Sequence, residues 1–393
     1  TVENTGTGAT TFQDNVVATN VNVNAGTSTF QDNLTATTTT ISTGTGNFNT
    51  VSGTTTSNLQ FAGNGTANLN NGLTGNVTTT TPGEGKLNLV GSNNQTVNGT
   101  VGGVGASLAE VNAGMNGAAS TFTGDVYATD ITVGNGTVNL DGNFTGTAIR
   151  YNADGTVVVA DTKNIDSAIT NNTGIDSQGT LTLNGSSTVT GQVGASGASL
   201  KEINAGVAGS TSTFNSNVYV TNLNMTGTGT VILNSDLTGN VVVTGNNQGI
   251  LTTTGLNKTI TGNIGSSTSL DLNTLNIGSD TDATNYSITT INGNVFANST
   301  VLNNNGTTNS SELILASGKN ITSTITTADA NMGILTLAGG TQTVTGTVGG
   351  VGASLEKVSS GATGATSTFV NNVYANTVEN TGTGATTFQD NVV

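Results

Sequence analysis

Carboxylates are the only side chains in this sequence that could carry acid–base chemistry. The chain holds 22 Asp and Glu residues and seven Lys and Arg residues, with no His and no Cys. Paired carboxylates beside a base can hydrolyse glycosidic bonds. The nearest approximations are three aspartate pairs: Asp125 with Asp130, Asp154 with Asp161, and Asp280 with Asp282. None of the pairs recurs with a base beside it, so we interpret them as solvated turn residues and predict no catalytic residue.

The missing residue types exclude further chemistry. Without His and Cys there is no Ser-His-Asp or Cys-His nucleophile, no thiolate or imidazole zinc site, no disulfide and no common haem ligand. We therefore predict that the chain is not an enzyme and needs no cofactor. Calcium is the remaining possibility, because it binds carboxylate and carbonyl oxygens. The glycine-rich stretches 102–107 and 349–354 lack the aspartate of calcium-binding nonapeptides, so Asp280 and Asp282 are the only metal candidates.

The charge distribution argues against two classes of partner. The formal net charge is −15, and the seven bases lie tens of residues apart, so no basic surface for nucleic acid is expected. No run approaches the ~20 apolar residues of a membrane span, and the first residues do not read as an export signal. We predict no nucleic-acid partner and no membrane span in this segment.

The most informative pattern is an internal repeat. Residues 1–17 read TVENTGTGATTFQDNVV, and residues 377–393 repeat this text without a change. We interpret 1–376 as one long repeat unit and 377–393 as the start of the next, with an overlap introduced at the two ends as the alternative. Adjacent copies of the same repeat, in a tandem array or by self-assembly, are the expected partners.

A looser repeat lies inside this unit. The text TVNGTVGGVGASL at 96–108 returns as TVTGTVGGVGASL at 343–355 and as TVTGQVGASGASL at 188–200, and a decayed copy runs from 251 to 300. These copies predict inner modules at approximately 85–178, 179–248, 249–332 and 333–393. The GASLxE text at 105–110, 197–202 and 352–357 is the only helix-like text, and we expect one helical turn at a corner there.

The shortest period predicts the fold. Phe12, Phe30 and Phe48 are spaced by 18 residues, about one turn of a β-solenoid. Short alternating strands occur at 87–89, 138–140, 157–159, 181–183, 231–233, 313–315 and 335–337. A β-sandwich would need more aromatic residues, and a propeller would need a stronger period of about 40 to 50 residues. We predict an all-β chain, one continuous parallel β-helix over 1–393 with coils of roughly 18 to 22 residues, about 17 to 21 coils in all.

This fold assigns roles to the aromatic residues. We expect a stack of phenylalanines in the core, made of Phe12, Phe30, Phe48, Phe122, Phe214 and Phe369. Three tyrosines follow the last three of these by five residues, an odd number, and should point outward as exposed contacts if the strand is unbroken: Tyr127, Tyr219 and Tyr374. Inward Asn and Thr at corners should form side-chain ladders between coils, because a buried unpaired amide costs about 1 to 3 kcal/mol.

The wording of three segments resembles a known family. ILTLAGGTQTVTGTVGGVGASL (334–355), STFTGDVYATDITV (120–133) and GTVNLDGNFTG (136–146) resemble the passenger domains of rickettsial surface-antigen autotransporters, the adhesins of the outer membrane protein A and B group. The resemblance implies an exported β-helical passenger at the bacterial cell surface that attaches to host cells or forms a coat. The membrane barrel of that family is not seen in this sequence.

These observations favour a non-enzymatic structural rod of a repetitive bacterial surface or extracellular fibre protein, which displays or spaces an adhesive surface. The first alternative is an autotransporter passenger adhesin that binds a host-cell surface protein or glycan. A carbohydrate-active β-helix enzyme is the more remote alternative.

Overall fold

A computed structural model describes residues 1–49, 51–279, 286–304 and 309–393 of the chain. The chain divides into two compact units, Thr1–Lys201 and Glu202–Val393. The described residues form β-strands and turns without any helix. Accordingly, no helix in the described ranges could span a membrane.

The first unit contains strands β1 to β21 and the start of β22. Their bounds are β1 Val2–Asn4, β2 Ala9–Phe12, β3 Val16–Val23, β4 Thr27–Phe30, β5 Leu34–Ile41, β6 Thr45–Phe48, β7 Thr55–Phe61, β8 Thr66–Leu69, β9 Leu73–Thr74, β10 Val77–Thr79, β11 Lys86–Leu89, β12 Gln95–Asn98, β13 Leu108–Ala113, β14 Ala119–Phe122, β15 Val126–Val133, β16 Thr137–Leu140, β17 Phe144–Tyr151, β18 Thr156–Val159, β19 Ile165–Asn171, β20 Thr180–Leu183, β21 Ser187–Val189 and β22 Leu200–Ala205.

The second unit contains the rest of β22 and strands β23 to β39. Their bounds are β23 Thr211–Phe214, β24 Val218–Met225, β25 Thr230–Leu233, β26 Leu237–Val243, β27 Gln248–Thr253, β28 Lys258–Ile260, β29 Leu272–Ile277, β30 Ile288–Ile291, β31 Val295–Leu302, β32 Glu312–Leu315, β33 Ile321–Thr327, β34 Ile334–Leu337, β35 Thr341–Thr345, β36 Leu355–Ser360, β37 Thr366–Phe369, β38 Ala375–Asn380 and β39 Ala385–Phe388.

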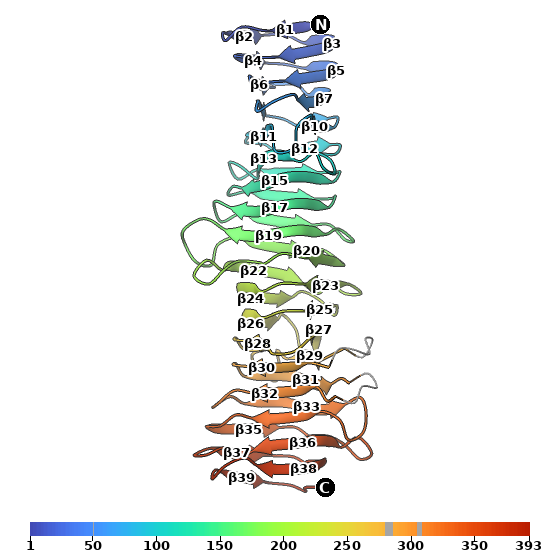
Figure 1. Cartoon of the computed structure of the whole chain (residues 1–393), viewed down its shortest axis with the longest axis vertical. Coiled ribbons are helices and arrows are strands. Elements are labelled where there is room, and N and C mark those ends of the chain that lie inside the picture. Colours follow the sequence, from blue (N-terminus) through green and yellow to red (C-terminus); the bar gives the residue numbers. More distant parts are fainter. Residues whose placement is uncertain (50, 280–285, 305–308) are drawn as a thin grey trace. The chain divides into compact units, whose positions relative to one another are not determined.

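Each unit is a parallel β-solenoid, and this confirms the predicted fold class. Strands of successive coils pair in parallel and build two sheets: in the first unit β14, β16, β18 and β20 follow one another in one sheet, and β13, β15, β17 and β19 in the other. Figure 1 shows these strands layer upon layer. Together the two units contain about 19 turns of roughly 20 residues in the described part of the chain.

Alternation of apolar and polar residues explains why these segments form strands. In a strand successive side chains point to opposite faces, so an apolar residue at every second position fills the interior. All seven predicted short strands are present; in β16, for example, Val138 and Leu140 are buried while Thr137 and Asn139 are only half-buried. Small aliphatic residues supply most of each coil's core, which is therefore stable only when neighbouring coils cover it.

Coil length varies more than the sequence suggested. The first coils repeat every 18 residues, since Phe12 pairs in register with Phe30 and Phe30 with Phe48. Farther along, Asn88 pairs with Asn112, 24 residues later, a longer coil than predicted. The additional residues project at the corners, because the strands themselves must keep their register to fill the core.

Side-chain ladders connect the coils, as predicted for the corner amides. On the outer face of the first unit, Asn68, Asn88 and Asn112 each donate from Nδ2 to Oδ1 of the equivalent asparagine one coil earlier, at 2.8, 2.8 and 2.7 Å. At a corner, Asn164 donates its backbone N–H to Oδ1 of Asn143 at 2.9 Å. Each amide thus uses its donor and its acceptor on opposite coils, which extends the backbone hydrogen bonding to side chains.

Two expectations differ from the structure. The GASLxE text forms no helical turn: residues 103–106 make a tight antiparallel turn, and β13 begins at Leu108. The reason is that Gly105 adopts a positive φ of 71°, which a helix does not allow, while Leu108 must be buried in the core. The boundary of the two compact units, at Lys201 and Glu202, lies inside the predicted module 179–248.

Candidate functional site

Four corner turns are the most distinctive feature of the outer surface. Each closes with an antiparallel bridge, unlike the parallel strands around it: Gly103 with Ala106, Ala195 with Ala198, Ser267 with Leu270, and Gly350 with Ala353. In the first, second and fourth turns the third residue is a glycine with φ near +70°, as a type II turn requires. The turns follow the repeated GTVGGVGASL-like text, so the inner repeat encodes a projecting corner.

The first and fourth turns carry an apolar residue at the tip. Val104 has 86% and Val351 has 90% of its surface exposed. A valine gains nothing from this position in the isolated unit, since neither side chain enters the core. The second turn carries Ser196 at the equivalent place.

An aromatic residue lies beside each turn that can be placed within one unit. Tyr127 donates its backbone N–H to the carbonyl of Val101 at 2.7 Å, and Tyr374 makes the same bond to Val348 at 2.7 Å. Phe296, in the decayed copy, donates to Ile264 at 2.8 Å. These aromatic side chains are half-buried and point outward between buried neighbours.

The glycine before each turn permits this close approach. A Cβ on Gly102 would lie 2.2 Å from the carbonyl oxygen of Tyr127, and one on Gly349 would lie 2.2 Å from that of Tyr374. Both glycines also have positive φ, 69° and 68°. The turn can therefore contact the aromatic strand only because these two positions have no side chain.

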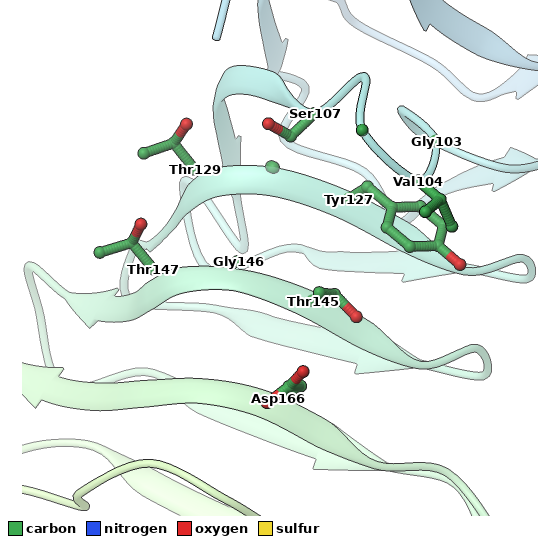
Figure 2. A pocket seen from close by; sticks show the side chains of 11 residues that line it. Gly103, Val104, Ser107, Tyr127, Thr129, Thr145, Gly146, Thr147 and Asp166 are labelled. Atoms are coloured by element: carbon green, nitrogen blue, oxygen red, sulfur yellow. The ribbon is translucent and has the colours of Figure 1, made fainter. Parts of the chain in front are cut away.

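A groove of about 580 Å³ opens between the first turn and the strands below it. It lies where β17 bends, because the register of β17 and β19 shifts between Thr145 and Ala148. Figure 2 shows the Tyr127 ring beside Val104 at one end of the groove and Asp166 at the other. Further lining residues are Gly103, Gly105, Ser107, Ala128, Thr129, Thr145, Gly146 and Thr147.

The second unit has a smaller groove in the equivalent position. It measures about 250 Å³ and is lined by Thr268 of the third turn, by Phe296, and by Thr322 and Thr324 of β33. Here too the register shifts, between Phe296 and Ser299. The grooves therefore follow from the corner design, and their depth follows from the residues at the tip and the bend.

The chemistry of the first groove is that of a neutral hydrogen-bonding surface. Among the described residues that line it, Asp166 is the only one with a charge, and it accepts a hydrogen bond from Thr190 Oγ1 at 2.8 Å. Threonine hydroxyls, glycine backbone and one aromatic ring make up the rest. Such a surface can bind an uncharged polar ligand or a peptide, and it presents no nucleophile–base pair.

The predicted acidic pairs are occupied individually. Asp125, Asp154 and Asp161 each accept a backbone N–H from the following coil, at 2.8, 3.0 and 2.8 Å. Asp130 forms an ion pair with Arg150 at 3.0 Å. In the described ranges no three His, Cys, Asp or Glu residues gather as a metal site.

The metal candidates Asp280 and Asp282 lie outside the described residues.

One other carboxylate on the outer face has a perturbed pKa. Partial burial raises the pKa of Glu110, but the ammonium of Lys86, 2.7 Å away, and hydrogen bonds from neighbouring side chains outweigh this effect and leave the pKa below its ordinary value. Glu110 is part of a surface ion pair along the coil direction.

The predicted core phenylalanines fall into separate groups. Phe12, Phe30 and Phe48 stack with ring centroids 4.9 and 5.3 Å apart, and Phe30 and Phe48 are buried. Phe122 is buried and pairs in register with Leu140.

In the second unit Phe214 pairs with Leu233, and Phe369 stacks on Phe388 at 5.2 Å. Each phenylalanine thus occupies an interior position, but a ring-on-ring stack forms only where adjacent coils both supply a phenylalanine.

The predicted outward tyrosines need a different explanation. Phe122 ends β14 and Tyr127 lies in β15, so the strand between them is broken and the odd spacing does not set their directions. Tyr127 points outward because its neighbours Val126 and Ala128 are buried. Tyr219 and Tyr374 are likewise half-buried beside buried valines.

Sequence reasoning missed two features. The tip valine Val104 could have been noticed as an apolar residue between glycines. Tyr151 is fully buried, donates its hydroxyl to the carbonyl of Thr180 at 2.6 Å, and has a pKa raised by burial. No local signal marks it, because its place beside Gly179, 28 residues later, depends on the coil length.

No protein-family model, curated protein or solved structure matches this chain.

Proposed function

We propose that this chain is a non-enzymatic structural segment of a repetitive bacterial surface or extracellular protein, whose solenoid spaces and displays projecting corners. The observation that carries the proposal is the recurrence of the corner turn with an outward aromatic beside it, at 101–127, 264–296 and 348–374. The backbone hydrogen bonds are kept while the tip changes from Val to Thr, as is expected of a display scaffold.

The uses of the acidic residues support the non-enzymatic part of this proposal. Three of the predicted aspartates accept turn N–H groups, and a fourth is neutralised by arginine. A pair of carboxylates for glycoside hydrolysis must face a common substrate with different protonation states. Carboxylates held as turn acceptors are not free for this role, and we propose no cofactor or metal.

The sequence supports an extracellular location. Seven basic residues in 393 offer few sites to trypsin-like proteases, and a chain without cysteine needs no redox control of folding. The resemblance to rickettsial autotransporter passengers supports the same location.

A second function, adhesion to a host-cell protein or glycan, is favoured by the groove beside Tyr127. A half-buried ring next to threonine hydroxyls and one carboxylate suits a neutral saccharide or a peptide. In this case the groove is the contact and the solenoid is its support.

One experiment separates the two functions. The purified chain is examined by sedimentation for self-association and by flow cytometry for saturable binding to cells. A structural segment self-associates and binds cells weakly, whereas an adhesin stays monomeric and saturates. Tyr127→Ala should abolish saturable binding of an adhesin, while Thr56→Ala, an exposed change outside the groove, should preserve it. Saturable binding lost only in Tyr127→Ala would replace the structural proposal by the adhesive one.

A further inference from the structure

The 17-residue duplication is a coil seen in two environments. We call Thr1–Val17 the first copy and Thr377–Val393 the second copy. Both form the same strand, β2 at Ala9–Phe12 and β39 at Ala385–Phe388. The first copy belongs to the first unit and the second copy to the second unit.

The first copy shows the contacts that this sequence makes with the coil that follows it. Phe12 stacks on Phe30 with centroids 4.9 Å apart and planes 9° from parallel. Asn15 Oδ1 accepts Nδ2 of Asn33 at 2.7 Å. β2 pairs with β4 along its whole length.

The second copy shows the contacts that the same sequence makes with the coil that precedes it. Phe388 stacks on Phe369 at 5.2 Å. Asn391, the equivalent of Asn15, donates its backbone N–H and its Nδ2 to Oδ1 of Asn372 at 3.2 and 3.3 Å. β39 pairs with β37 along its whole length.

The two sets of contacts use different atoms of the same residues. The phenylalanine uses one ring face for each neighbour. The asparagine donates to the preceding coil and accepts from the following one, which is the arrangement of the ladders inside the first unit. The glutamate accepts from Asn24 at 2.9 Å in the first copy and pairs with Lys357 at 3.6 Å in the second. One coil of this sequence can therefore satisfy both neighbours at once.

We propose that two copies of this chain join head to tail by coil exchange: residues 377–393 of one copy displace Thr1–Val17 of another and pair with its residues 18–34. The displaced and the incoming coil have the same sequence, so every contact of the first copy is restored and every contact of the second copy is kept. This inference rests on the proposed structural function and names its partner, a second copy of the chain, together with the junction that joins them.

Cysteine cross-linking tests the junction, because the chain has no natural cysteine. Thr11 pairs in register with Thr29, and Thr387 is the equivalent of Thr11. Parallel strands lie about 4.8 Å apart, within the range of a disulfide. An acceptor chain carries Phe12→Asp, to weaken its first copy, and Thr29→Cys; a donor chain carries Thr387→Cys. The oxidised mixture should contain disulfide-linked acceptor–donor dimers.

Three variants serve as controls. Phe388→Asp in the donor should lower the yield of mixed dimers at least about tenfold, since the incoming coil loses its ring contact. Thr145→Cys, an exposed position elsewhere in the first unit, replaces Thr29→Cys to measure random collision. Thr368→Cys with Thr387→Cys should close within one chain, which shows that the second copy is folded.

The outcomes are distinct. Dimers at the collision level, with the Thr368–Thr387 disulfide formed, would overturn coil exchange. If the chains then still self-associate in sedimentation, the structural function stands and only the junction is wrong. If they do not self-associate at all, the structural function fails as well.

Discussion

Two regions of the first unit solve the same packing problem differently. In the region of β2, β4 and β6 every coil has 18 residues, and identical interior positions hold stacked phenylalanines. In the region of β12 to β17 the coils are longer, and the interior positions hold different residues, such as Phe122 beside Leu140. The additional residues form the corner turn with Val104 at its tip.

The difference separates what a coil must keep from what it can vary. Strand register and an apolar interior are kept in both regions, because a slip of one residue would turn every core side chain outward. Corner length and outward residues vary, because their additional atoms face solvent. Changes inside should therefore cost most in the uniform region, and changes at corners should matter only where the turn contacts the next coil.

The largest effect is expected in the phenylalanine stack. Phe30→Ala leaves a cavity between two rings and should lower the free energy of unfolding by about 3 to 5 kcal/mol. Tyr127→Ala, at a half-buried outward position, should cost much less. Urea unfolding followed by circular dichroism measures both, and an equal loss in the two variants would contradict the distinction between the regions.

The corner glycine comes next. Gly102→Ala places a Cβ 2.2 Å from the Tyr127 carbonyl oxygen at a positive φ, so we expect a loss of about 1 to 3 kcal/mol. Gly103→Ala, one residue along, meets nothing within 4 Å and should be nearly neutral. The pair is compared by thermal unfolding, and a neutral Gly102→Ala would show that the turn does not depend on this contact.

The asparagine ladder should give a smaller effect. Asn68→Ala removes two amide hydrogen bonds, to Asn47 and from Asn88, and should cost about 1 kcal/mol. Hydrogen exchange of the amides of β6, β8 and β11 should accelerate locally. The exposed change Thr56→Ala in β7 is the control, and similar exchange in both variants would deny the ladder a stabilising role.

The smallest effect concerns pH. The folded-state pKa of Glu110 is lowered, so its contribution is present above its ordinary pKa of 4.5 and is lost as the pH falls through the lower folded value. The Lys86–Glu110 pair is partly exposed, so the loss should stay below about 1 kcal/mol. Unfolding midpoints of the native chain and of Glu110→Gln should differ at pH 7 and converge near pH 3; a constant difference would exclude this pair as the cause.

Much of the fold could be predicted from particular residues. The two-residue alternation at 138–140 and 157–159 and the spacing of Phe12, Phe30 and Phe48 gave the strands and the solenoid. The candidate site was only half visible: Tyr127 was recognised as an outward residue, but the turn before it was mistaken for helical text. A short Gly-Ala-Ser-Leu segment has no propensity strong enough to distinguish a tight turn from a helical one.

By itself, the amino-acid sequence determined that the chain is all-β, that small aliphatic residues alternate into a core, and that one 17-residue coil occurs twice. These are local or repetitive properties, and alternation and spacing express them directly. Only the tertiary structure decided which residues meet across coils: Val104, Tyr127 and Asp166 around one groove, and Tyr151 beneath Gly179. Those meetings depend on the length of each corner, because coil length sets the register, and no single segment of the sequence contains it.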